Sequence, residues 1–123
     1  MQIQIIGFWL IERKDHMDGK FLGKITSAEF GVDRDYRYDF GLYLTFSIDA
    51  STVSCMYAAN INPECKYNTP SGRQDAVLAM AEQVAAIFKA AKVTKVSELV
   101  GKPVEVTIEN RTFKNFRILT EVL

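Results

Sequence analysis

The stretch that decides the fold is Phe40–Asp49, FGLYLTFSID, because its apolar and polar residues alternate without a break. Four apolar side chains fall on one side of an extended chain, and three side chains with hydroxyls fall on the other. The apolar set is Leu42, Leu44, Phe46 and Ile48, and the hydroxyl set is Tyr43, Thr45 and Ser47. A period of two over this length predicts a strand with one buried face.

Strands are predicted on both sides of this stretch. Asp49–Ser51 is typical of a hairpin turn, and the alternation resumes over Thr52–Ala59. Upstream, Lys24–Val32 also alternates and predicts a strand. The opening segment Met1–Ile11 is apolar but short and runs directly into charged residues, so it predicts a strand and not a signal peptide.

The second half of the chain contains the one clear helical pattern. Asn60–Gly72 has turn chemistry throughout, and Asp75–Lys92 then places apolar residues at helical spacing. A short helical turn is expected within Val93–Val100, because Gly101 follows as a natural stop. Pro103–Ile108 and Phe113–Val122 predict a final hairpin.

These elements predict one α+β domain over residues 1–123, a mostly antiparallel sheet of five or six strands packed against one long amphipathic helix. Five helical residues are expected to face the sheet: Val77, Met80, Val84, Ile87 and Phe88. Either Thr69 or Ser71 is expected to cap the helix. The other face of the sheet, with its hydroxyls, is expected to meet water or a second subunit.

Composition excludes several classes of protein. Fifteen basic and fifteen acidic residues give zero net charge, so a protein that depends on phosphate neutralisation is not favoured and nucleic acid is an unlikely partner. No stretch is long and apolar enough for a membrane span, so we expect a cytoplasmic protein. Cys55, Cys65 and the lone His16 lack metal-site spacing, so no metal or other cofactor is expected. Paired catalytic carboxylates are also absent from the pattern, so we expect no enzyme.

The strongest chemical feature is the segment that leads into the helix. A glycine, two hydroxyls and the guanidinium of Arg73 stand where backbone amides at a helix start could meet a phosphate. A capped helix with a solvated arginine is the simpler interpretation. Further along, basic residues at Arg111, Lys114 and Arg117 are interleaved with glutamates, which favours cross-strand ion pairs.

A second feature is the aromatic and charged segment Asp33–Asp39. Its tyrosines and arginines have the chemistry of a single-strand binder, but its three aspartates oppose a positive field, and a solvated loop is the simpler interpretation. Trp9, Tyr36, Tyr38 and Tyr43 present more aromatic surface than one helix covers, which predicts a homo-oligomer.

The order of four segments resembles small phage-encoded α+β proteins, among them the nucleotide sponges of the Thoeris anti-defence type. The segments are Gly23–Gly31, Leu42–Ile48, Met56–Asn60 and, after one helix, Val93–Val106, which contains Ser97–Val104. The resemblance implies a non-enzymatic oligomer in the cytoplasm of an infected bacterial host that sequesters a cyclic or ADP-ribose-derived nucleotide signal. A nucleotide second messenger would then meet aromatic, amide and arginine groups, for which the candidates are Tyr57, Asn60, Thr69, Arg73 and Arg111.

Two other functions remain open from the sequence. The protein could inhibit a host defence nuclease by occupying its surface, as anti-CRISPR proteins do. It could also be an accessory protein that binds single-stranded nucleic acid, although zero net charge weighs against that function.

Overall fold

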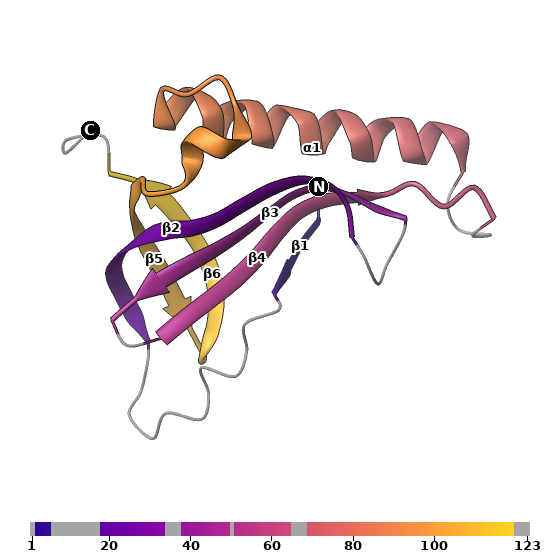
Figure 1. Ribbon diagram of the computed structural model, residues 1–123. Helices are drawn as coiled ribbons and strands as arrows, with labels where there is room; N and C mark the ends of the chain where they lie inside the picture. The colour runs from indigo at the N-terminus through magenta and orange to yellow at the C-terminus, as the bar shows by residue number, and fades with distance from the viewer. Residues whose placement is uncertain (1, 6–17, 34–37, 50, 65–68, 120–123) are drawn as a thin grey trace.

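The computed structural model of the protein describes residues 2–5, 18–33, 38–49, 51–64 and 69–119. Within these residues six strands form one antiparallel sheet with the spatial order β1-β4-β3-β2-β5-β6, and a long helix lies along one face (Figure 1). The strands are β1 (Gln2–Ile5), β2 (Gly19–Val32), β3 (Asp39–Ile48), β4 (Ser51–Asn60), β5 (Pro103–Glu109) and β6 (Thr112–Ile118). The helix α1 spans Pro70–Ala91, and the short 3-10 helix η2 spans Val96–Leu99. The predicted α+β fold is confirmed.

Three boundaries differ by several residues from those predicted, and the other differences are of a single residue. β2 begins at Gly19 and not at Lys24, because its first residues find a partner strand, β5, far along the chain. α1 begins at Pro70 and not at Asp75, since proline fits the first turn of a helix. β6 ends at Ile118. Of the predicted first strand, only Gln2–Ile5 lies among the described residues.

β2 links the two halves of the sheet, because it pairs with two neighbouring strands along different parts of its length. Its first part pairs with β5 from Gly19↔Ile108 to Lys24↔Pro103, and its later part pairs with β3 from Gly23↔Ile48 to Val32↔Phe40. Gly23 takes part in both ladders. A Cβ at residue 23 would collide with the Ser47 carbonyl oxygen and the Ile48 side chain, so this crossing requires glycine.

The sheet curls around its core where β2 changes neighbour. An irregularity in register between Ile25 and Ser27 adds to the bend, and the β5–β6 hairpin lies at a steep angle across β3 and β4 (Figure 1). As a result, aromatic rings from β6 reach strands that are not their neighbours. Phe116 lies 4.8 Å from the Phe46 ring and 6.1 Å from the Tyr57 ring, measured between centroids.

The helix closes the core on the inner face of the sheet. Met80 and Ala91 are its buried residues, and Val84, Ile87 and Phe88 pack against the core from partly exposed positions. Thr69 caps its start and Lys92, in the left-handed region, ends it. The predicted short helical turn is also present as η2, where the Glu98 carboxylate accepts hydrogen bonds from the backbone amides of Thr94 and Lys95.

The chain order and pairing of β2 to β6 resemble those of an OB-fold, but among the described strands β6 pairs only with β5 and the outer edge of β4 pairs with β1, so the sheet stays open. Three strands form a meander, a helix follows, and the first strand of the final hairpin pairs with the first strand of the meander. OB-folds are five-stranded, partly open barrels. In this chain β1 pairs along the outer edge of β4, and β6 approaches β4 through the Phe116–Tyr57 ring contact.

The core assignment predicts a large effect of truncating Phe46, which is fully buried and stacks 5.8 Å from the Phe113 ring. Phe46→Ala is expected to lower the free energy of unfolding by about 3 to 5 kcal/mol, through lost burial and a residual cavity. Leu22→Ala is the matched control, because Leu22 is 69% exposed on the same sheet and its loss should change stability by less than about 0.5 kcal/mol. Urea unfolding measures both, and equal effects would refute the core assignment.

Candidate functional site

The outer face of the sheet, away from α1, carries rows of hydroxyl groups across three strands. The pairing register places Lys24, Ser47 and Thr52 in one row, and Ser27, Thr45 and Ser54 in the next. These six residues define the hydroxyl face. The Thr45 and Ser54 hydroxyls lie 3.1 Å apart, and the Thr26 hydroxyl donates to the Thr45 carbonyl oxygen at 3.3 Å. The sequence prediction of a hydroxyl-rich second face is confirmed.

Tyr43 extends the hydroxyl face toward the end of β3. Its ring lies in the row of Glu29 and Met56, and its hydroxyl donates to the Asp39 carbonyl oxygen. Burial, followed by the charges of Asp33 and Asp39, raises the pKa of Tyr43 to about 12. Burial and Asp33 also raise the pKa of the Asp39 carboxyl above its ordinary value. The phenol is therefore neutral at physiological pH and its ring is held by the hairpin.

Cations border the hydroxyl face along β2 and β6. Lys20 and Lys24 alternate with buried or partly buried core residues, so both point outward and are exposed. On the final hairpin, Lys114 pairs with Glu109 at 2.7 Å and Arg117 pairs with Glu105 at 3.0 Å. The predicted cross-strand ion pairs are thus present, and they neutralise the β6 cations. The two lysines of β2 carry the positive charge at this face.

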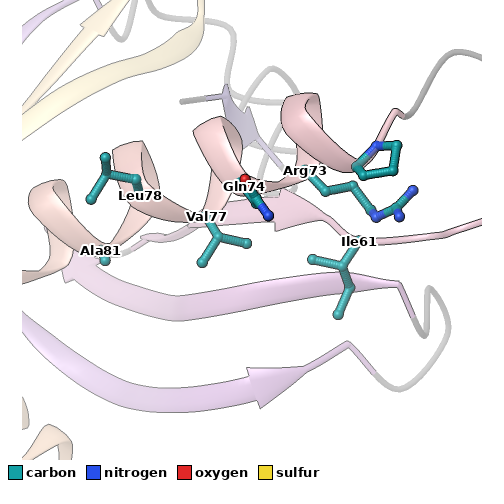
Figure 2. A pocket seen from close by; sticks show the side chains of 7 residues that line it. Ile61, Arg73, Gln74, Val77, Leu78 and Ala81 are labelled. Carbon is teal, nitrogen blue, oxygen red and sulfur yellow. The ribbon is translucent and has the colours of Figure 1, made fainter.

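A separate, shallow groove of about 520 Å³ lies on the inner side of the sheet, beside the first half of α1 (Figure 2). The walls formed by described residues are mostly aliphatic, with one charged residue, Arg73, and one amide, Gln74. In Figure 2 Val77 points from the helix toward the strands, and Ile61 lies across from it. The lining residues are Ile61, Pro70, Arg73, Gln74, Val77, Leu78 and Ala81.

The five residues proposed from sequence as a nucleotide site do not form one site. Tyr57 is only 6% exposed and belongs to the core, where burial raises the pKa of its phenol and of the neighbouring Cys55 thiol. Arg111 lies in the β5–β6 turn, where its backbone amide donates to the Asp18 carboxylate. That turn lies at the Gly19 end of β2, whereas Asn60 lies at the end of the sheet where β2 finishes.

The other three residues either line the groove or stand next in the chain to a residue that lines it. Asn60 precedes Ile61 of the groove, Thr69 precedes Pro70, and Arg73 lines the groove itself. The amides predicted to receive a phosphate are already engaged, however. The Gly72 amide donates to the Thr69 hydroxyl oxygen at 3.0 Å, and the Arg73 amide donates to the Thr69 carbonyl oxygen at 2.8 Å. The helix start is capped from within the chain.

Two features of these surfaces were not predicted from the sequence. Lys24 was expected at a strand end, but the β2 ladder with β5 places it at the centre of the sheet. The groove joins Ile61, from a predicted loop, to Val77 and Leu78, of which Val77 was expected to be core. Leu78 is the one sequence signal for this surface, because it is a leucine among helical alanines that falls outside the predicted buried face of the helix.

No protein-family model, curated protein or solved structure matches the chain. Across residues 2–5, 18–33, 38–49, 51–64 and 69–119, no helix is long and apolar enough to cross a membrane. The same ranges hold no group of three histidine, cysteine or acidic residues that could bind a metal ion. His16, Cys65, Tyr36 and the arginines at 34 and 37 lie outside the described residues.

The cap geometry yields a prediction about Thr69. Thr69→Ala should lower the free energy of unfolding by about 0.5 to 2 kcal/mol, because the Gly72 amide loses its acceptor. Thr69→Ser keeps the hydroxyl and should stay within about 0.5 kcal/mol of the wild type. Chemical denaturation followed by circular dichroism measures both. A Thr69→Ala protein as stable as the wild type would mean that the hydroxyl is not used as a cap.

Proposed function

We propose that the protein is an accessory factor that binds single-stranded nucleic acid across its hydroxyl face. The observation that carries the proposal is the connectivity of β2 to β6, with β2 shared between two ladders. OB-folds with this connectivity bind oligonucleotides or oligosaccharides over their second and third strands and the adjoining loops. The corresponding strands here are β3 and β4. Because fold alone does not determine function, this part of the argument is an analogy that the side chains must support.

The side chains of this face suit an extended, flexible strand. Hydroxyls on β3 and β4 donate to phosphate and sugar oxygens without reading sequence. The Tyr43 ring, held by its bond to Asp39, supplies a surface on which a base can stack, and stacking is tolerant of base identity. Lys20 and Lys24 supply the phosphate contacts. These groups support binding with little sequence preference.

The charge balance sets the expected strength of binding. The logarithm of the binding constant falls linearly with the logarithm of the salt concentration, and each phosphate contact adds roughly −0.7 to the slope for a single strand. About two contacts therefore predict a slope of about −1.4. Such binding is weak, with a Kd on the order of 1 to 100 µM at moderate salt. The zero net charge of the chain therefore limits the affinity without excluding the function.

Sequestration of a small nucleotide is the second candidate, and one observation favours it. Arg73 lines the groove, and Asn60 and Thr69 each precede a residue that lines it, which supports three of the candidate residues lying near one surface. The engaged amides of the helix start and the core position of Tyr57 leave Arg73 as its main phosphate contact. The two candidates use opposite faces of the sheet and can be separated by mutation.

Fluorescence anisotropy of a labelled oligothymidylate, titrated with the full chain over a series of salt concentrations, tests the proposal. Lys24→Gln should weaken binding and reduce the magnitude of the salt slope by about 0.7, because one phosphate contact is lost. Lys89→Gln is the matched control, since Lys89 is exposed on α1 away from the hydroxyl face. Tyr43→Ala should weaken binding by about 1 to 3 kcal/mol, whereas Tyr43→Phe should retain the stacking.

Two results would reject the proposal. Absence of binding at low salt would remove it, as would equal affinities and salt slopes for Lys24→Gln and the wild type. If cyclic dinucleotides or cyclic ADP-ribose bind the wild type, and Arg73→Ala weakens them while Lys24→Gln does not, sequestration of a small nucleotide takes its place.

A further inference from the structure

We propose that the groove beside α1 is a docking site for a partner protein, and that the partner contributes a short extended segment in which apolar side chains accompany a carboxylate. This surface lies on the opposite side of the sheet from the hydroxyl face. The proposal therefore does not depend on the proposed function, and both surfaces can be occupied together.

The walls of the groove select an apolar occupant. Ile61 and Pro70 come from the segment after β4 and the start of α1, and Val77, Leu78 and Ala81 come from the helix. Leu78 is 61% exposed, which is unusual for a leucine next to a core. None of the lining residues within the described part of the chain is aromatic, so these walls offer no ring on which a nucleobase would stack. Aliphatic walls of this kind favour aliphatic side chains over a nucleotide.

The apolar surface continues from the groove across the sheet. The Ile61 amide donates to the Tyr38 carbonyl oxygen at 2.8 Å, so the groove adjoins the start of β3. In the next row of the inner face Phe40 pairs with Val32, and Phe30 packs edge-on against Phe40 at 5.2 Å. Phe30 and Val32 are 45% and 52% exposed. The surface therefore runs from α1 across β3 to β2, a length that suits an extended segment better than a compact small molecule.

Charge complementarity defines the other property of the occupant. Among the described residues that line the groove, Arg73 is the one with a charge, and its side chain is partly buried (Figure 2). A guanidinium against aliphatic walls forms stronger, charge-assisted hydrogen bonds with a carboxylate than with a neutral group. Gln74 adds an amide that can pair with the backbone of an extended segment. The partner segment is therefore apolar with an acidic residue.

Three labelled peptides test the proposal on the full chain without nucleic acid. In each peptide leucine alternates with a second residue, which is aspartate, asparagine or lysine. Fluorescence anisotropy should show the aspartate peptide binding roughly tenfold more tightly than the lysine peptide, a difference of about 1.4 kcal/mol. Arg73→Glu should reverse this order, and Lys89→Glu, a charge reversal on the same helix outside the groove, should leave it unchanged.

Leu78→Glu provides the second readout. Leu78 is exposed, so the variant should melt within a few degrees of the wild type and yet lose the aspartate peptide. Equal affinities for the three peptides, or unchanged binding by Leu78→Glu, would overturn the proposal. A nucleotide that displaces the peptide at lower concentration would assign the groove to a small ligand. A wild-type dimer that Leu78→Glu converts to a monomer, measured by light scattering, would assign it to a second copy of the chain.

Discussion

β2 can belong to two ladders because residue 23 has no side chain. The main chain of β3 approaches Gly23 so closely that any Cβ would overlap the Ser47 carbonyl oxygen, and at this place the pairing of β2 with β3 begins while its pairing with β5 comes to an end. Beyond it, the Ile25 amide donates to the Lys102 carbonyl oxygen, and the Ile25 carbonyl accepts from the Gly101 amide. These backbone bonds fix the angle between the two halves of the sheet. The curled shape follows from them.

Curling gives the sheet two faces with different chemistry. On the inner face, which is concave, rings from β6 contact Phe46 and Tyr57, and α1 covers most of the remaining apolar surface. On the outer face, which is convex, the alternation of each strand exposes the hydroxyl face together with Tyr43 and the two lysines of β2. The helix extends beyond the filled core at its first half, which leaves the groove near Ile61 and Leu78. The two proposed binding surfaces are thus consequences of one packing arrangement.

Sequence periodicity predicted the elements well because their signals are local. The alternation of residues 40–49 and the turn after it correspond to β3 and the β3–β4 hairpin, and the hydroxyl face follows from the same alternation. Partnership between distant segments carries no such signal. The strand predicted over Lys24–Val32 did not include the first residues of β2, yet the β5 strand pairs with them from Gly19 onward. For the same reason, local patterns did not reveal that Arg111 and Arg73 lie at different ends of the sheet, and both were proposed for one site.

We propose that the hydroxyl face binds nucleic acid and that the groove beside α1 does not. Amide chemical shifts of the ¹⁵N-labelled chain, followed during titration with unlabelled oligothymidylate at low salt, test it most directly. The account predicts that the shifts concentrate at Lys24, Tyr43, Thr45 and Ser54 and that Ile61, Val77 and Leu78 stay unmoved. Shifts confined to the groove residues, or none on either face at millimolar oligonucleotide, would contradict it.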